Sequence, residues 1–340
     1  MNANQGLATS SSSGIAFAYN AENGDPYHRL GTAVSGYGNI DQMLEASGAD
    51  FDVQLTELWV VDEYGEMLSV PNKYATTTFD VATEATRVLG VVGNGYEIEQ
   101  NREAAQFAYD CVGASSGDAI IDTMGLLKNG SEFFTYVRLE PLVLAPSNGA
   151  IDTLEMGLAI RTSHDGSVSL CAFPTATRLV CSNSVMTAFT TAQRNEQMVK
   201  VRHTKNKDNY KSEAIDVLGI SNKVRDSFMS TAIDMMETPA TFKNVMKCAD
   251  YLWPAATQTD PTARAVTVDE ARKDKLVELW LSPTNAKGFG ENLWTAWQTI
   301  GEYLDHHRGL DANKRALASM NPESSVTAQK QKAARFLLSV

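Results

Sequence analysis

The sequence is poor in the residues that hold metals or form disulfide bridges. Only four cysteines and five histidines occur among 340 residues. No two cysteines form a C-x-x-C pair. His306 and His307 are adjacent, so on a helix they point about 100° apart and do not share a metal easily. We therefore predict no metal site and no cofactor. The cysteines are expected as small buried hydrophobes, although Cys171 and Cys181 could face each other across neighbouring strands.

Long apolar runs are also lacking. The longest, such as Val88–Val92 and Pro141–Ala145, are far shorter than the roughly 20 residues that span a bilayer. The stretch from Met1 to Gly14 is polar and Ser-rich, with no basic start and no apolar segment. We interpret residues 1–24 as a flexible tail and not as a signal peptide. The expected location is the cytoplasm, away from any membrane.

Catalytic signatures are missing as well. There is no G-x-S-x-G motif and no P-loop, and the glycines between Gly90 and Gly95 lack the dinucleotide-binding spacing. Glu97 and Glu99 are not followed by the lysine that a metal-dependent nuclease would need. The pair His164-Asp165 could be catalytic, but Asp-Gly is typical of a hairpin turn, which is the simpler interpretation. We predict that the protein is not an enzyme.

Charge is present but unevenly distributed. The chain is 43% hydrophobic and 21% charged, enough for a sizeable core, and its net charge is −12. That excess disfavours indiscriminate binding to nucleic acid or anionic membranes. Between Arg194 and Arg225, however, eight basic residues stand against four acids, a local charge of +4 that leaves −16 on the rest. Such a segment is commonly a solvated loop and helix face, but it could also contact phosphates.

The first half of the chain carries mainly the two-residue periodicity of half-buried strands. Strands are predicted at 51–61, 71–79, 88–92, 119–127, 132–144, 153–161, 167–173, 178–181 and 198–203. Val88–Val92 is expected to be a fully buried strand. Helices are predicted at 39–47 and 101–112. The second is expected to be capped by Asn101 and to turn five residues inward: Ala104, Ala105, Phe107, Ala108 and Cys111. Ser182–Ser184 is expected to cap a further helix that ends near Thr191.

The second half carries helical spacing instead. Helices are predicted at 208–236, 241–252, 269–281, 289–308 and 326–338, with a linker at 254–267. On the helix over 289–308, a regular stripe is expected to face the core: Phe289, Leu293, Trp297, Ile300 and Leu304. The fold class is therefore α+β. A mixed, mostly antiparallel sheet with one or two helices is expected over residues 25–205, and a helical array over 206–340.

Six segments, taken in order, resemble one family. They are Asp25–Gly31, Leu89–Tyr96 with Gln100–Glu103, Thr162–Ser167, Thr177–Ser184, Val201–Thr204 and Glu302–Arg308. Together they resemble the phage/plasmid-like proteins, a prokaryotic family known as domain of unknown function 932. Tyr27 stands where that family usually has Trp, and Ser182 where Gln is common. The resemblance implies a setting on phages, prophages or plasmids, and it supplies no established catalytic residues.

Two functions follow from this combination. The first is single-stranded DNA binding or annealing in recombination, by a homo-oligomeric ring or filament. The residues expected to bind the nucleic acid are Lys200, Arg202, His203, Lys205, Lys207 and Lys211, with Arg178 and Asn183 nearby and Tyr210 or Tyr96 stacking on a base. The second is an acidic protein-binding or structural assembly module that acts on a host factor, because an acidic surface can mimic the charge of DNA.

Overall fold

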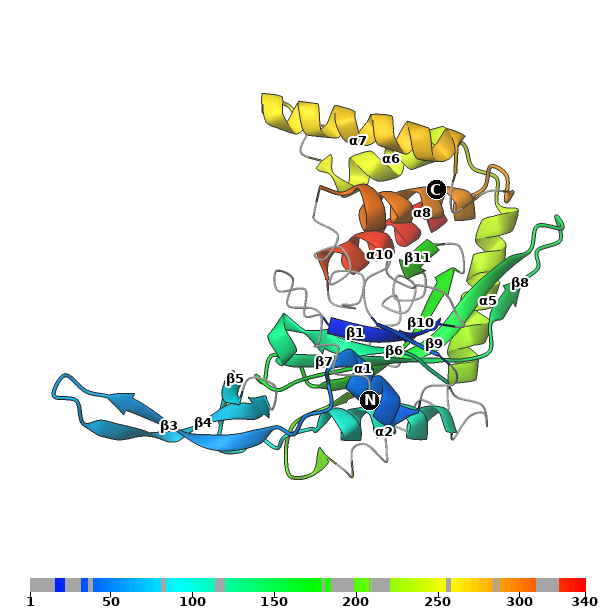
Figure 1. Ribbon diagram of the computed structural model, residues 1–340. Coiled ribbons are helices and arrows are strands. Elements are labelled where there is room, and N and C mark those ends of the chain that lie inside the picture. The colour runs from blue at the N-terminus through cyan, green and yellow to red at the C-terminus, as the bar shows by residue number, and fades with distance from the viewer. Residues whose placement is uncertain are drawn as a thin grey trace. The chain divides into compact units, whose positions relative to one another are not determined.

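The protein is described by a computed structural model with an α+β fold (Figure 1). It describes residues 16–21, 32–35, 39–80, 84–113, 120–178, 181–184, 199–207, 209, 221–254, 258–283, 286, 288–309 and 324–340. These residues form two compact units. Unit 1 takes the described residues within 1–139, 157–174 and 198–220. Unit 2 takes those within 140–156, 175–197 and 221–340.

The main sheet of unit 1 is mixed and mostly antiparallel, as predicted. Its strands are β1 (Ala16–Asn20), β2 (Thr32–Val34), β6 (Ile120–Leu127), β7 (Glu132–Arg138), β9 (Asp152–Ser163), β10 (Leu170–Arg178) and β12 (Val199–Val201). They lie in the order β10-β9-β7-β6-β1-β2, and β12 pairs with β10. Among the strand pairings of this sheet that the structure describes, only that of β1 with β2 is parallel. A short 3-10 turn, η2 (Lys128–Gly130), joins β6 to β7.

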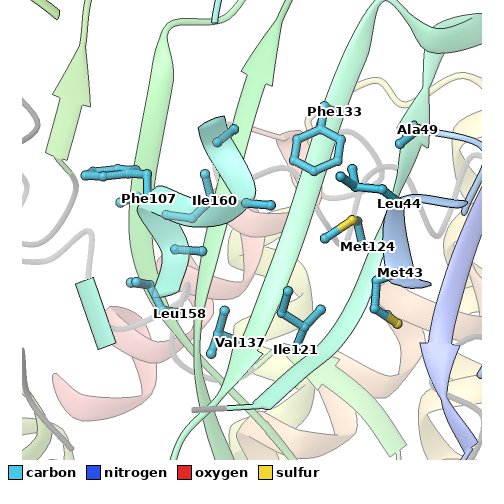
Figure 2. Packing of buried hydrophobic residues seen from close by; sticks show 14 of the residues in the cluster. Met43, Leu44, Ala49, Phe107, Ile121, Met124, Phe133, Val137, Leu158 and Ile160 are labelled. Atoms are coloured by element: carbon cyan, nitrogen blue, oxygen red, sulfur yellow. The ribbon is translucent and has the colours of Figure 1, made fainter. Parts of the chain in front are cut away.

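Two helices pack on this sheet and build its core (Figure 2). Helix α1 (Ile40–Ser47) begins at a capping box formed by Asn39 and Gln42 and ends at Gly48, which has the left-handed φ of 69°. Helix α2 (Asn101–Gly113) buries all five residues expected to face inward: Ala104, Ala105, Phe107, Ala108 and Cys111. Each large apolar side chain that joins this cluster contributes about 1.5–3 kcal/mol relative to exposure.

A second sheet of three antiparallel strands belongs to the same unit. Strands β3 (Gln54–Val61), β4 (Met67–Asp80) and β5 (Ala85–Gly93) lie in that order. Strand β5 pairs only with Lys73–Asp80 of β4, so the outer part of the β3–β4 hairpin is a two-stranded ribbon. The expectation of a fully buried strand at Val88–Val92 is wrong. Val88 and Val91 are exposed while Leu89 and Val92 are buried, because the register of β5 shifts between Val88 and Gly90 and interrupts the alternation of side chains.

Unit 2 contains a helical array, also as predicted. Its helices are α5 (Ser221–Glu237), α6 (Phe242–Leu252), α7 (Ala263–Leu281), α8 (Leu293–Glu302), the π-helix η5 (Tyr303–His307) and α10 (Ser325–Leu338). The whole predicted stripe from Phe289 to Leu304 is buried. In the same unit, β8 (Leu142–Leu144) pairs with the start of β9, and the end of β10 pairs with β11 (Cys181–Ser184).

Two local expectations in unit 2 are wrong. Residues 178–181 do not form one strand, because Arg178 ends β10 and pairs with Cys181 at the start of β11. Ser182–Ser184 belong to β11, and the helix that they were expected to cap lies outside the described residues. The linker is shorter than predicted, because the side chain of Thr262 accepts from the backbone N–H of Ala265 and starts α7 at Ala263.

Two buried polar pairs lie in the core of unit 2. Lys330 is buried on α10, and its Nζ lies 2.5 Å from Asp305 Oδ2. The indole N–H of Trp294 donates to Asp152 Oδ2 at 3.1 Å. The buried carboxylate of Asp305 on η5 explains why Lys330 points inward. The thiols of Cys111, Cys171 and Cys248 are buried and not joined in disulfide bonds. In the part of the chain that the structure describes, no helix is long and apolar enough to cross a membrane.

Candidate functional site

Part of the predicted basic segment lies exposed on unit 1. Strand β12 runs antiparallel to β10, with Val201 opposite Leu170 and Lys200 opposite Cys171. Val201 is buried, whereas Lys200 and Arg202 point to solvent, because side chains alternate along a strand. Lys205, in the turn that follows, is exposed as well. We call Lys200, Arg202 and Lys205 the basic strip.

His203 follows the strip in sequence but turns inward. Its Nε2 lies 3.2 Å from the hydroxyl of Thr162 and 3.2 Å from the carbonyl oxygen of Val168. A carbonyl oxygen can only accept, so this geometry puts the ring hydrogen on Nε2. The ring stacks on Tyr96, with centroids 4.8 Å apart and planes 26° apart. The Tyr96 hydroxyl donates to the carbonyl of Ser163 at 2.5 Å, so both rings are engaged within the protein.

Burial affects Tyr96 electrostatically too. The pKa of its phenol is raised above the ordinary value by desolvation, with further contributions from the negative charges of Asp165 and Glu99. The phenol therefore stays protonated and keeps its hydrogen bond. A tyrosine held by a hydroxyl bond at one end and a stacked imidazole on its face is a fixed part of the fold. Tyr96 is therefore not proposed to stack on a base.

Lys207 is likewise committed to unit 1. Its Nζ donates to the carbonyl of Ile98 at 2.6 Å and to Glu103 at 2.9 Å, and it lies 3.2 Å from Glu99 Oε2. Burial lowers the pKa of this lysine. The hydrogen bond to Glu103 and the charges of Glu99 and Glu103 outweigh that effect and raise the pKa overall. The ammonium therefore neutralises carboxylates of its own chain and is not available to a phosphate.

Beneath the strip lies a set of buried polar side chains around His164. Its Nε2 lies 2.9 Å from Asn101 Oδ1, and its backbone N–H donates to the carbonyl of Ser131 at 2.7 Å. The amide of Asn101 donates to the carbonyl of Ala49, which fixes Oδ1 toward the histidine, so His164 Nε2 carries the hydrogen. Because its side chain makes these two hydrogen bonds, Asn101 does not serve as the expected N-cap of α2. It is the first residue of α2, and its side chain bonds across the core instead.

The remaining nitrogen of His164 is bare. Nδ1 is buried without a hydrogen-bond partner, and the side chain has no exposed surface. Burial, with a smaller effect of His203, lowers the pKa of His164 to about 4, so the ring is neutral at pH 7. Asp165 is not its partner, because Asp165 Oδ1 accepts from the backbone N–H of Ser167 at 2.8 Å. The geometry thus matches the hairpin turn and not a catalytic His–Asp pair.

Next to His164 a buried carboxylate is paired with two cations. Glu132 has no exposed surface, and its Oε2 accepts from Arg161 Nε at 3.1 Å and from Nη2 at 2.5 Å. Lys128 Nζ forms an ion pair with the other oxygen. Two guanidinium nitrogens of Arg161 thus share one carboxylate oxygen, and hydrogen bonds between charged groups are stronger than neutral ones. We call Asn101, Glu132, Arg161, His164 and His203 the buried polar cluster.

The three-stranded sheet joins this cluster at Gly90 of β5. A Cβ built at Gly90 would lie 2.4 Å from Asp165 Cβ and 2.5 Å from its Cα, which no side chain tolerates. Gly166, with φ 75°, makes the turn that brings Asp165 there. Glycine at residue 90 therefore allows the backbone of β5 to touch the turn between β9 and β10.

The other expected binding residues are placed differently. Tyr210 and Lys211 lie outside the described residues. Arg178 and Asn183 belong to β10 and β11 within unit 2, and their side chains also lie outside the described part. Of the nucleic-acid-binding residues predicted from the sequence, the basic strip alone is both described and exposed.

The buried polar cluster was not predicted from the sequence, although one signal pointed to it. Three of the segments that resemble the family meet there: the one ending at Glu103, the one over Thr162–Ser167 and the one over Val201–Thr204. Within the described residues, no group of three or more His, Cys, Asp or Glu side chains could hold a metal ion.

A family model described as Domain of unknown function (DUF932) matches residues 88–335, well over half of the chain. The chain therefore belongs to that family. No curated protein and no solved structure matches it.

Proposed function

We propose that this member of the DUF932 family binds single-stranded DNA through the basic strip, in the cytoplasm of a cell that hosts a phage or plasmid. The observation that carries the proposal is the exposure of Lys200, Arg202 and Lys205 on a chain whose net charge is −12. An acidic surface repels polyanions, so a local group of exposed cations marks the place where a phosphate backbone is tolerated.

The geometry of the strip favours an extended strand over a duplex. Lys200 and Arg202 project from the same side of β12, with Cα atoms about 7 Å apart. Successive phosphates of an extended single strand are separated by a comparable distance. Readers of duplex DNA commonly place a helix or ribbon in the major groove, whereas the strip begins on a three-residue strand and continues into the turn after it.

The strip is small, and this sets the expected strength. For single strands the logarithm of the affinity falls by about 0.7 per phosphate contact for each tenfold rise in salt. Three contacts therefore predict a slope near −2, or about a 20-fold loss of affinity between 50 and 200 mM salt. One copy of the chain should bind weakly and without sequence preference.

The test measures fluorescence anisotropy of a labelled thymidine oligonucleotide at 50 and 200 mM salt. The triple variant K200Q/R202Q/K205Q should lose binding. The matched control K243Q/K247Q/K332Q removes the same charge from three exposed lysines of α6 and α10 and should retain it. No binding by the native protein at 50 mM salt, or equal losses in both variants, would overturn the proposal.

A second function, a protein-binding or structural assembly module, is favoured by a separate feature of unit 1. The β3–β4 hairpin exposes large apolar side chains, which a surface for nucleic acid does not require. The partner that this hairpin fits is inferred next.

A further inference from the structure

The outer part of the β3–β4 hairpin is unusually apolar for a surface in contact with water (Figure 1). We call the segment Trp59–Ser69 the arm. Within it Trp59 is 46% exposed, Val61 67%, Tyr64 83% and Met67 64%. A two-stranded ribbon without further packing is marginally stable in water. Large exposed apolar patches mark interaction sites.

The register assigns the exposed side chains to two faces of the arm. Trp59 pairs with Ser69 and Val61 with Met67, so these residues lie on one face. Val60 pairs with Leu68, and both point to the opposite face, where they are also about half exposed. The face with Trp59, Val61 and Met67 is the larger, and we call it the tryptophan face. Pro71, just beyond the arm, has no N–H to extend the ladder, so faces and not edges are the expected contact.

Charge is polarised along the hairpin. The tip carries Asp62, Glu63 and Glu66, of which Glu63 and Glu66 are exposed. Asp62 Oδ1 accepts from the backbone N–H groups of Tyr64 and Glu66 and so shapes the turn. At the other end, where pairing with β5 begins, Lys73 is exposed. Lys73 lies seven residues from Glu66, a separation of roughly 20 Å along the strand.

We propose that the arm packs antiparallel against the arm of a second copy of this chain, tryptophan face to tryptophan face. Antiparallel packing about a two-fold axis brings the acidic tip of each copy to the end of the other arm near Lys73. A parallel arrangement would bring the two acidic tips together and is disfavoured. The contact is self-complementary, as a two-fold interface requires.

The size of the tryptophan face agrees with this partner. Trp59, Val61 and Met67 of this face, together with Tyr64 in the turn that follows β3, leave roughly 500 Å² of side chain outside, given that an aromatic residue buries about 150–250 Å². A standard interface buries about 800 Å² per partner, of which somewhat over half is apolar. The exposed face together with Lys73 and the two exposed glutamates therefore matches what a dimer needs.

Self-association would also change what the basic strip can do. Two strips on one dimer bind the same strand at a raised effective concentration, so the weak affinity of one copy is multiplied without any new contact to DNA. The dimer itself depends only on the arm. It can therefore be tested without nucleic acid.

The first test measures the mass of the full-length protein by light scattering and sedimentation over a range of concentrations. The native chain should be dimeric. The variant W59S/V61T/M67T should raise the dissociation constant about 100-fold or more, because it removes the central apolar contacts. The matched control V268T/L281S replaces exposed apolar residues of α7 and should leave the mass unchanged.

The second test addresses the antiparallel order. K73E alone and E63K/E66K alone should each weaken the dimer, whereas the combination of all three should restore it within a few-fold. An S69C variant should form a symmetric disulfide, because Ser69 lies near the centre of the proposed contact and the described cysteines of the native chain are buried. Failure of the combined charge swap to restore the dimer would overturn the antiparallel arrangement.

Other outcomes identify other partners. A native chain that is monomeric throughout the micromolar range would overturn the proposal, as would a dimer unaffected by the tryptophan-face variant. A monomer that floats with phosphatidylcholine vesicles in a density gradient would also overturn it and assign the arm to a lipid surface. A monomeric arm variant that keeps weak, salt-dependent oligonucleotide binding would support both proposals, because it would show that the arm carries dimerisation and the basic strip carries contact with DNA.

Discussion

In unit 1, the region around His164 buries a glutamate, an arginine and a histidine, whereas the arm leaves a tryptophan, a valine and a methionine largely in water. Both arrangements reverse the usual placement of these residue types. They differ in how the free-energy cost of this placement is compensated. Glu132 and Arg161 satisfy each other within one chain, at 2.5 Å. The tryptophan face has no comparable cover among the described residues.

This difference in compensation distinguishes residues that stabilise the fold from residues that are available to bind a partner. Removing one member of a buried pair leaves an uncompensated charge in the core and is costly. Removing an exposed apolar side chain costs the single chain almost nothing. The stability of each variant therefore reports which class a residue belongs to, and the expected effects fall in a definite order.

The largest effect is expected for Glu132→Ala. Arg161, only slightly exposed, would lose the carboxylate that balances its charge, so the free energy of unfolding should fall by about 3–5 kcal/mol. Urea denaturation followed by circular dichroism measures this. The exposed Glu45→Ala on α1 serves as the control and should change stability by about 0.5 kcal/mol or less. Equal small changes in both would mean that the buried pair does not matter to the fold.

The next effect depends on pH. The pKa of His164 is about 4 in the folded protein and near 6.5 in the unfolded chain, so below pH 6.5 the unfolded state takes up a proton that the folded state does not. Stability should fall by roughly 3 kcal/mol as the pH drops from about 6.5 to about 4. His164→Gln should remove this part of the pH dependence. If the native and variant curves stay parallel over that interval, His164 is not the group responsible.

A smaller effect is expected for Lys207→Met. The substitution keeps the length of the side chain but removes the ion pairs with Glu99 and Glu103, so unfolding should become easier by about 2 kcal/mol. Lys205→Met is the matched control, because Lys205 is exposed two residues away and should change stability little. The two variants reverse their order in DNA binding. There Lys205→Met should have the greater effect, since Lys205 belongs to the strip.

The smallest effect on stability is expected in the arm. W59S/V61T/M67T should change the free energy of unfolding of the single chain by about 0.5 kcal/mol or less per substitution, measured at concentrations where the chain is monomeric. A loss of several kcal/mol would show that the arm is packed within its own chain. The contrast with the buried polar cluster would then disappear.

The sequence supports accurate predictions wherever a pattern is local. The helical spacing from Ala104 to Cys111 identified the buried face of α2, and the stripe from Phe289 to Leu304 identified the core of α8. Alternation identified β3 and β12 as strands. Even so, the buried strand expected at Val88–Val92 is half exposed, because a short apolar run does not state whether one face or both are covered.

The buried polar cluster could not be predicted, because its partners are distant in sequence. Arg161 and Glu132 are 29 residues apart and meet through the pairing of β7 with β9. Lys207 and Ile98 are 109 residues apart. Periodicity indicates which face of an element a residue occupies but not what lies opposite. Lys207 was therefore counted with the basic segment, although its charge is balanced inside unit 1.

The contact at Gly90 has a mechanical consequence for the arm. The backbone of β5 touches the backbone of Asp165 directly, with no side chain between them to absorb movement. β5 pairs with β4, the strand that carries one side of the arm. A force exerted on the arm by a bound partner is therefore transmitted through β4, β5 and the contact between Gly90 and Asp165 to the turn beside His164. The arm is therefore coupled mechanically to the region of the buried polar cluster, where substitutions are expected to cost the most stability.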